Sequence, residues 1–386
     1  MKDYQQRLLL LQIIILASFK HGSSSIVTKN TRVVHDYGGA VGSMVGAQPQ
    51  EVSAMFVFGD SLVDNGNNNY LASWAKSNYE PYGIDFNQGP TGRFCNGKTI
   101  IDLLGDLLGL PYIPAHASVY KVEMMQRGVN YASAAGGILD VTGRDLGDRF
   151  SLGQQVGHFI ENMNQMGKEM GTKTNMSEYL SKSIAVVIIG SNDYINNYLL
   201  PTLYATSYYY RPDDYADLLI NHFSEKLMEL HSAGLRKFFL AGVGPLGCIP
   251  NQLANNFVPH RQCVLYVNQM VQMFNVRLRS LIDSLNNKNP GAIFVYGDTY
   301  GAFNDMIKNP SKYGFQVNDH GCCGLGLNQG QITCLPNATP CANRKEYVFW
   351  DAFHPTEAVN SILAHRAYLG PPSDCHPMNV KQMVQI

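Results

Sequence analysis

One segment in the middle of the chain, residues 184–189, restricts the possible folds most strongly. It reads Ile-Ala-Val-Val-Ile-Ile, an uninterrupted apolar run rich in β-branched residues. Such a run is typical of a strand covered on both faces, whereas a strand with one exposed face alternates polar and apolar residues. Four further segments have strand-like composition, at residues 54–58, 128–132, 237–243 and 292–296. The sequence therefore predicts five strands.

Apolar stripes with helical spacing lie between the later strands. One stripe contains Leu218, Leu219, Phe223, Leu227 and Leu230, and another contains Val267, Met270, Val271, Phe274, Leu278, Leu281 and Leu285. Strands that alternate with helices form a mainly parallel sheet with helices on both faces. We therefore predict an α/β fold, a three-layer sandwich around a central, mainly parallel five-stranded sheet. No linker or repeat divides the chain, so it forms a single domain with long loop insertions at residues 67–97, 199–211 and 314–345.

Polar or glycine-rich segments directly follow the first three predicted strands. Ser61 follows residues 54–58, Gly136 and Gly137 follow residues 128–132, and Asn192 follows residues 184–189. The carboxyl ends of parallel strands meet at one edge of the sheet, which is where α/β proteins bind ligands. These residues are therefore expected to lie near one another.

An Asp and a His near the end of the chain supply what a serine needs to become a nucleophile. A serine hydroxyl requires a base, and an imidazole can take its proton if a carboxylate orients the ring. Asp351 and His354 are three residues apart, so a helical turn or a tight loop brings the carboxylate to the ring. The Asp351–His354 pair alone is more typical of a surface cap, and Ser61 alone is more typical of a helix N-cap. With Ser61 they predict a catalytic triad.

An acyl-transfer reaction also needs hydrogen-bond donors for the negative charge that forms on the carbonyl oxygen. Asn192 offers a side-chain amide, and the glycine pair offers a backbone N–H. The Ser61 N–H completes the predicted oxyanion hole, with Gly136 and Gly137 as alternative glycine donors.

Four sequence blocks together resemble the plant-type GDSL esterase/lipases of the SGNH hydrolase superfamily. They are Phe56 to Asn69, Gly128 to Ser133, Gly190 to Tyr194 and Asp351 to Thr356, in the order in which the family carries them. The resemblance implies an SGNH, flavodoxin-like sandwich and ester hydrolysis. It also implies that Ser61 is the nucleophile, that Gly137 or Gly136 and Asn192 serve the oxyanion, and that Asp351 and His354 complete the triad. An ordinary α/β-hydrolase would instead carry its serine in a Gly-x-Ser-x-Gly elbow.

The predicted activity is hydrolysis of lipid-like or other acyl esters through an acyl-enzyme on Ser61, without a metal or cofactor. An acyltransferase that passes the acyl group to an alcohol would use the same residues. A catalytically silent binding protein on the same scaffold is a third possibility, and the intact set of site residues argues against it. The natural ester and the oligomeric state stay open.

The start of the chain has the architecture of a secretory signal peptide. Residues 8–19 are apolar except for Gln12 and Ser18, Lys2 and Arg7 precede them, and small residues follow. As a helix this stretch is about 18 Å long, shorter than the roughly 30 Å of a bilayer core, so no permanent membrane anchor is expected. We divide the chain into a signal peptide at 1–25, a mobile leader at 26–50, the hydrolase domain at 51–375 and a C-terminal tail at 376–386. The protein is expected to be secreted.

The cysteines and the charge agree with that compartment. An even number of cysteines behind a signal peptide favours disulfides, and zinc at Cys322, Cys323, Cys334 and Cys341 is the less favoured alternative. Asn175 and Asn337 begin N-glycosylation sequons. The net charge is −1 and only 15% of residues are charged. Since no basic run is present to neutralise phosphates, nucleic acid is not an expected partner. The expected partner is a small-molecule ester or lipid substrate.

Overall fold

The computed structural model describes residues 52–386 except 171–172 and 257–261. These residues belong to one compact unit, Gln50–Ile386. The predicted signal peptide at 1–25 and leader at 26–50 lie outside the described residues, so both stay predictions.

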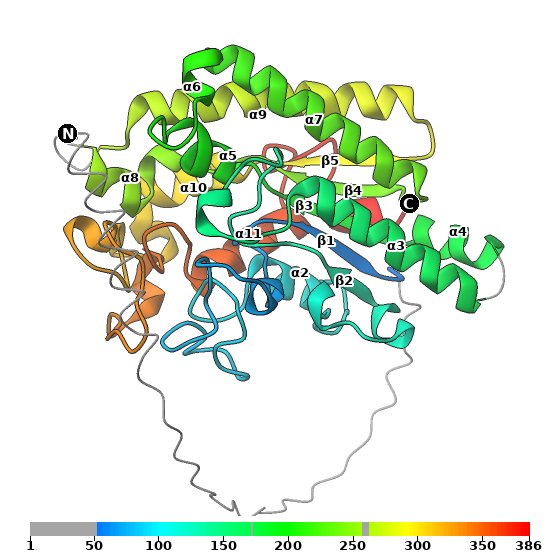
Figure 1. Cartoon of the computed structure of the whole chain (residues 1–386), viewed down its shortest axis with the longest axis horizontal. Helices are drawn as coiled ribbons and strands as arrows, with labels where there is room; N and C mark the ends of the chain where they lie inside the picture. Colours follow the sequence, from blue (N-terminus) through cyan, green and yellow to red (C-terminus); the bar gives the residue numbers. More distant parts are fainter. Residues whose placement is uncertain (1–51, 171–172, 257–261) are drawn as a thin grey trace, which may run out of the picture. The chain divides into compact units, whose positions relative to one another are not determined.

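The centre of this unit is a six-stranded sheet with the order β2-β1-β3-β4-β5-β8 (Figure 1). Five strands match the predicted segments and pair in parallel: β1 (Met55–Gly59), β2 (Gly128–Asn130), β3 (Ile184–Ile188), β4 (Lys237–Ala241) and β5 (Ile293–Gly297). The sixth strand, β8 (Cys375–His376), was not predicted and pairs antiparallel to β5. The mainly parallel α/β sheet is confirmed, with one more strand than expected.

Alternate side chains of the strands enter two separate apolar cores, as the two-residue period of a strand requires. Phe56 and Phe58 of β1 pack with the helices on one face, and Met55 and Val57 pack with those on the other. The first face is covered by α3 (Leu152–Met170), α7 (Pro212–Ser232) and α9 (Leu265–Lys288). The second is covered by α2 (Ile100–Leu107), α10 (Thr299–Lys308), α11 (Glu357–Leu369) and α12 (Val380–Val384). Figure 1 shows α7 and α9 on one side of the sheet and α2 on the other. The two predicted apolar stripes lie on α7 and α9.

The last residues of the chain are part of this core. Strand β8 includes His376, and the following helix α12 buries Val380, Met383 and Val384 against the second face. Residues 376–386, which we set apart as a tail, therefore fold with the domain.

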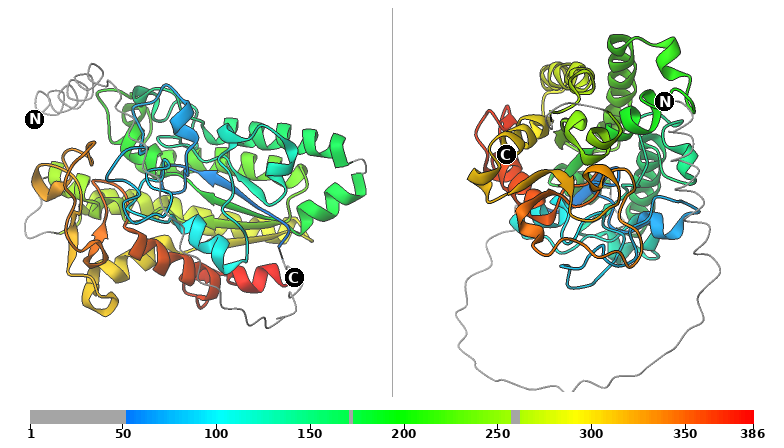
Figure 2. Two further views of the ribbon diagram at one scale, coloured as in Figure 1. Left: turned by 90° about the horizontal axis from the view of Figure 1, so that it is seen from below. Right: turned by 90° about the vertical axis from the view of Figure 1, so that its left-hand side faces the viewer.

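The remaining elements are short and lie mostly in the connections. They are α4 (Lys173–Ser181), α5 (Ser191–Asp193), α6 (Thr206–Tyr209), α8 (Pro250–Asn255), the π-helix η6 (Tyr194–Tyr198), and the 3-10 helices η2 (Asn67–Tyr70), η3 (His116–Ser118), η4 (Val122–Met125), η5 (Arg144–Leu146), η7 (Leu246–Cys248), η9 (Pro310–Tyr313), η10 (Leu327–Gln329) and η11 (Arg344–Glu346). A separate two-stranded sheet pairs β6 (Val317–Gly321) with β7 (Tyr347–Phe349) in parallel. This small sheet closes the cysteine-rich insertion, coloured orange in Figure 2.

Six of the eight cysteines form disulfides, which pair Cys248 with Cys263, Cys322 with Cys341, and Cys323 with Cys334. The four cysteines of the zinc alternative are therefore bonded to one another, so that alternative is wrong. Cys95 and Cys375 are buried free thiols. Within the described ranges, no cluster of His, Cys, Asp and Glu is placed to hold a metal ion.

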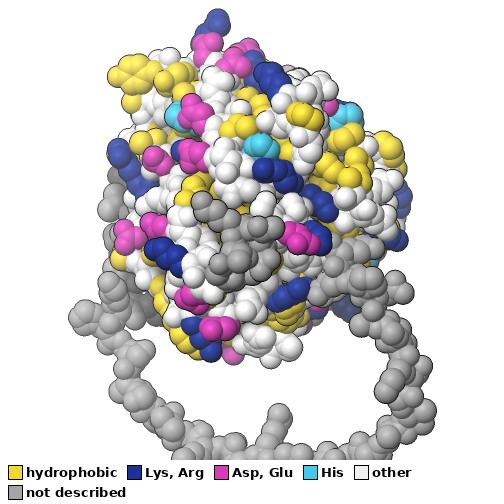
Figure 3. Space-filling view, turned by 90° about the vertical axis from the view of Figure 1, so that its right-hand side faces the viewer, with side chains coloured by type: hydrophobic (Ala, Val, Ile, Leu, Met, Phe, Trp, Pro, Cys, Tyr) yellow, Lys and Arg dark blue, Asp and Glu magenta, His cyan; other side chains and the backbone are white. Residues whose placement is uncertain are grey.

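The surface of the described unit mixes charges of both signs. On the face drawn in Figure 3, Lys and Arg side chains are interspersed with Asp and Glu. The helices within residues 52–386, gaps excepted, include none whose length and apolar character would let it cross a bilayer.

Candidate active site

The candidate residues gather where the order of the sheet reverses. Strand β1 lies between β2 and β3, so the connection after β1 leads toward one edge of the sheet and the later connections lead toward the other. A crevice opens at such a switch point beyond the carboxyl ends of the strands. Ser61 follows β1 by two residues, and Asn192 lies in α5, just after β3. The fold therefore brings together residues 131 positions apart.

Ser61, His354 and Asp351 form a continuous chain of hydrogen bonds. The Nε2 atom of His354 lies 2.8 Å from the Ser61 Oγ. The other ring nitrogen, Nδ1, lies 2.8 Å from Oδ1 and 2.9 Å from Oδ2 of Asp351. A carboxylate bonded at Nδ1 fixes the proton there and leaves Nε2 free to accept the hydroxyl proton. The three residues thus have the geometry of a nucleophile, a base and the group that orients the base.

A tight loop, and not a helical turn, places the Asp beside the His. Oδ1 of Asp351 accepts the backbone N–H groups of Phe353 and His354, each at 2.8 Å, so the side chain folds back over its own loop. The His354 carbonyl accepts the Trp350 N–H at 2.8 Å, and α11 begins at Glu357. The spacing of three residues is therefore sufficient to build this pair locally.

Burial and hydrogen bonds shift the pKa values of two carboxyls at the site in opposite directions. Burial would raise the pKa of Asp351, but attraction to His354 and hydrogen bonds from His354, Tyr82 and Phe353 hold this pKa below its usual value. Burial raises the pKa of Asp60 to about 7, although the Leu62 N–H and the charge of His354 oppose the rise. Asp351 is thus ionised near neutral pH, as the triad geometry requires.

Asn192 has its amide fixed in one orientation. Its Oδ1 accepts a hydrogen bond from Asn196 Nδ2 at 2.7 Å, and its Nδ2 donates to the Gly136 carbonyl at 2.9 Å. An amide nitrogen carries two hydrogens, so one remains after this bond. Asn192 lines the same cavity as Ser61 and His354. Its second N–H is therefore available to an atom bound there.

The two glycines have different surroundings, and neither lines the cavity. The Gly136 N–H donates to the Ser133 carbonyl at 3.0 Å, and the Gly136 carbonyl orients Asn192. The N–H of Gly137 has no hydrogen-bond acceptor among the described residues. A side chain at Gly137 would collide with Thr142 and with the Asp193 carboxylate. Gly137 is thus the glycine of the two whose N–H is unused.

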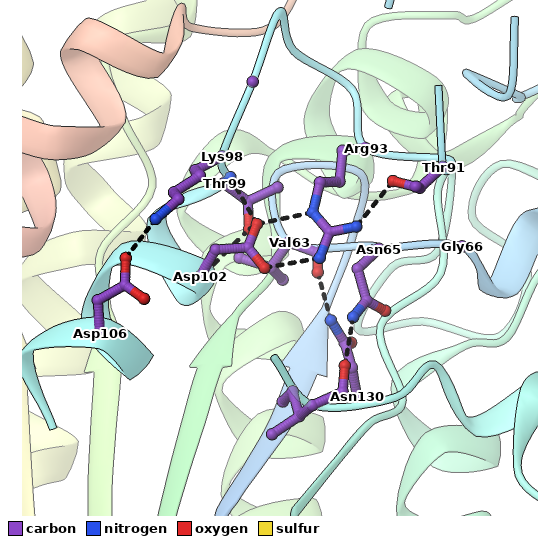
Figure 4. Close-up of polar contacts among 12 residues, drawn as sticks. Val63, Asn65, Gly66, Thr91, Arg93, Lys98, Thr99, Asp102, Asp106 and Asn130 are labelled. Carbon is purple, nitrogen blue, oxygen red and sulfur yellow. Dashed lines mark hydrogen bonds and ion pairs between the residues drawn. The ribbon is translucent and has the colours of Figure 1, made fainter. Parts of the chain in front are cut away.

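Buried amides hold the turn that carries Ser61. Gln155 of α3 accepts the Gly59 N–H and donates to the Gly59 carbonyl, both at 2.8 Å. On the other side of the turn, Asn130 Nδ2 donates to the Val63 carbonyl at 2.6 Å (Figure 4). The side-chain amides of Gln155 and Asn130 therefore fix the backbone two residues before and two residues after Ser61.

The cavity beside Ser61 is mainly apolar. The empty space between its walls is about 710 Å³, a figure that includes open solvent at its mouth. The polar side chains on its wall include Asp60, Ser61, Ser191, Asn192, Thr299 and His354. Its apolar wall consists of Leu62, Ile188, Ile189, Ile195, Val243, Pro245, Leu246, Ile249, Phe303, Phe349, Phe353 and Pro355. Such a site favours an apolar group next to the nucleophile.

Three residues that touch the triad were not predicted from the sequence. Tyr82 Oη donates to Asp351 Oδ2 at 2.6 Å, and Thr333 Oγ1 lies 3.4 Å from the same oxygen. The Phe94 ring packs against the His354 ring with 5.1 Å between centroids. All three come from the long insertions, where no periodicity or motif indicated a role.

The two sequons lie away from strands. Asn175 falls in α4, and Asn337 is an exposed residue of the cysteine-rich insertion. Glycosylation at either residue stays a prediction.

Comparison with known proteins identifies the family of the chain. The family model described as GDSL-like lipase/acylhydrolase matches residues 55–367. The chain belongs to this family. It is 56% identical over 333 residues to the Arabidopsis thaliana protein named GDSL esterase/lipase At1g71250, an alignment that covers 86% of this chain and 89% of the relative. It is 57% identical over 340 residues to GDSL esterase/lipase At5g08460 of the same plant, covering 86% and 88%.

The family confirms the resemblance carried by the four sequence blocks. GDSL esterase/lipase 7 of Arabidopsis thaliana is a further relative, 48% identical over 339 residues, or 86% of this chain and 92% of the relative. As a GDSL-like lipase/acylhydrolase, the chain is a carboxylic ester hydrolase.

Proposed function

We propose that this GDSL hydrolase is secreted and cleaves acyl esters through a covalent acyl-enzyme on Ser61. The observation that carries the proposal is the hydrogen-bonded chain from Ser61 through His354 to the buried Asp351, which ends at an apolar cavity. A hydroxyl bonded to a base that is itself oriented by a carboxylate is the arrangement that activates a serine.

In the acylation step, Ser61 Oγ attacks the ester carbonyl while His354 Nε2 takes the hydroxyl proton. The imidazolium that forms is stabilised by Asp351. Negative charge develops on the former carbonyl oxygen, and the Ser61 N–H and the second N–H of Asn192 are the proposed donors that receive it. Gly137 N–H is the proposed third donor. When the intermediate collapses, His354 returns the proton to the leaving alcohol.

In the deacylation step, a water molecule replaces the alcohol. His354 takes a proton from the water, which attacks the acyl carbonyl, and the same donors again receive the oxyanion. Collapse releases the carboxylic acid and returns the proton to Ser61. No metal or cofactor has a part in this sequence.

The cavity favours acyl esters as substrates. Its wall is formed largely by apolar side chains such as Ile188, Leu246 and Phe303, which would exclude water from a bound acyl chain. We infer that the acyl group of a lipid-like ester lies there, with its carbonyl at Ser61. A panel of aryl esters with increasing chain length measures how long a chain the cavity accepts.

Secretion is supported by three independent features. The first 25 residues have signal-peptide composition, three disulfides are present, and Asn337 of one sequon is exposed. Disulfides persist in oxidising compartments and are rare in the cytosol.

One experiment tests the proposed activity against its alternatives. The purified protein is incubated with an aryl ester and a competing alcohol, and free acid and transferred ester are both counted. The proposal predicts that acid predominates and that Ser61→Ala forms neither product while remaining folded. A predominance of transferred ester would identify an acyltransferase, and no product from the wild-type protein would identify a silent member of the family.

A further inference from the structure

The carboxylate of Asp351 receives hydrogen bonds on both oxygens. Oδ1 accepts two N–H groups of its own loop. Oδ2 accepts the Tyr82 hydroxyl at 2.6 Å, with Thr333 Oγ1 at 3.4 Å. Both oxygens lie within 2.9 Å of His354 Nδ1, and Asp351 is fully buried. Besides the bond from His354, the short side-chain hydrogen bond to Oδ2 is therefore the one that Tyr82 donates.

Tyr82 is suited to act as a permanent donor. Its side chain is only 1% exposed, and burial together with the charge of Asp351 raises the pKa of the phenol well above its usual value. The hydroxyl thus stays protonated and can donate to the carboxylate. Its ring contacts the rings of Tyr79, Phe94 and Trp350, with centroids 5.3, 6.0 and 6.0 Å away. This packing fixes the direction in which the hydroxyl points.

The insertion that carries Tyr82 is anchored to the body of the domain. Arg93 makes two hydrogen bonds of 2.7 Å to the carboxylate of Asp102 in α2, and a third to Thr91 (Figure 4). The guanidinium and the carboxylate are both buried. The next residue, Phe94, lies against the His354 ring. The same insertion therefore contacts both the Asp and the His of the proposed triad.

We propose that Tyr82 is a positioning residue for the reaction, acting through Asp351. This inference rests on the proposed function, because it assigns Tyr82 a part in the chemistry of Ser61 and His354. The Tyr82 hydroxyl holds the plane of the carboxylate so that an oxygen stays on Nδ1 of His354. It also withdraws negative charge from the carboxylate, because a buried donor bonded to an anion stabilises that charge.

Substitution Tyr82→Phe removes the hydroxyl and keeps the ring. The carboxylate then loses a charge-assisted hydrogen bond and can rotate, so kcat falls about tenfold while KM changes less than about twofold. With less of its charge withdrawn, Asp351 stabilises the protonated imidazole more strongly. The acid limb of the kcat/KM profile therefore moves to higher pH.

Tyr79→Phe is the matched control. Tyr79 is in the same insertion, its ring contacts Tyr82, and its hydroxyl donates to the Cys334 carbonyl at 2.9 Å. This variant loses one partly buried hydroxyl of the same aromatic cluster but leaves the Tyr82–Asp351 bond intact. Its kcat and its pH profile are expected to match those of the wild-type protein.

A spectroscopic measurement separates this inference from the proposed function. The proton on Nδ1 of His354, bonded to a carboxylate, gives a downfield proton NMR resonance that Asp351→Asn identifies by its loss. Tyr82→Phe is expected to shift this resonance and Tyr79→Phe to leave it in place, whether or not the protein hydrolyses the ester chosen. An unshifted resonance and an unchanged pH profile in Tyr82→Phe would overturn the inference. Equal losses of kcat in both variants would also overturn it, since the insertion would then have a general structural role.

Discussion

Asn192 gives the sharpest prediction about how the reaction is stabilised. One hydrogen of its amide is bonded to Gly136, and the other is available at the cavity. If that hydrogen receives the oxyanion, Asn192→Ala removes a donor that acts in the transition state. Loss of one such donor costs about 100-fold to 1,000-fold in kcat, or about 2.7–4 kcal/mol, with little change in KM.

The same substitution also has a structural cost that can be calculated separately. It leaves the Gly136 carbonyl and the Asn196 amide without their partner, at about 1 kcal/mol each. A loss of about 2 kcal/mol lowers the melting temperature by roughly 3 °C for a domain of this size. Asn196→Ala is the control, because it breaks one of these bonds and leaves the Asn192 amide in place. Its kcat is expected to stay within about threefold of the wild-type value.

The assay measures kcat, KM and melting temperature of both variants with one aryl ester. The oxyanion assignment predicts a large fall in kcat for Asn192→Ala alone, and slower fluorophosphonate labelling. If Asn192→Ala lost stability but kept a kcat close to that of Asn196→Ala, Asn192 would only hold the turn after β3, and the assignment would be refuted.

Three further predictions concern stability, pH and covalent state. Gln155→Ala leaves the buried Gly59 N–H without its acceptor, while the Gly59 carbonyl keeps the Ser133 N–H as a donor, so the free energy of unfolding should fall by about 1–3 kcal/mol. The exposed neighbour Gln154→Ala should change it less, and urea unfolding compares the two. Because burial raises the pKa of Asp60 to about 7 from its ordinary value of 3.8, the folded protein binds this proton more tightly than the unfolded chain, so stability falls as pH rises between these values. Asp60→Asn cannot titrate, and its stability relative to wild type should therefore rise by as much as about 4 kcal/mol from pH 4 to pH 8, while a constant difference would contradict this charge state. Secreted protein, denatured without reductant, should lack Met1 and alkylate at two thiols, Cys95 and Cys375; more alkylated thiols or a retained Met1 would contradict the proposed secretion.

The parts of the fold that could be predicted are those encoded by local patterns. The covered strand at 184–189 and the stripe that includes Phe223 depend on periodicity within a short window, and both are found in the structure. The Asp351–His354 pair is also local, because three residues of loop suffice to join the two side chains. The placement of Ser61 and Asn192 after neighbouring strands follows from the general rule for parallel sheets.

The parts that could not be predicted depend on contacts between distant segments. Tyr82 meets Asp351 across 269 residues, and nothing in the composition of residues 67–97 indicates which side chain reaches the carboxylate. Strand β8 is two residues long, too short for an alternation pattern, and it exists because β5 offers an edge. The even number of cysteines did not reveal that Cys95 and Cys375 stay unpaired, since pairing depends on distances in the folded chain.

The central claim is that Ser61 is the nucleophile activated by His354, and peptide mapping after fluorophosphonate labelling tests it most directly. The protein is labelled and digested, and the modified residue is located by mass spectrometry. We predict that the label is on the peptide containing Ser61, at Ser61 itself, and that labelling is lost in Ser61→Ala and strongly slowed in His354→Ala. A label on another serine, or undiminished labelling of Ser61→Ala, would contradict the account.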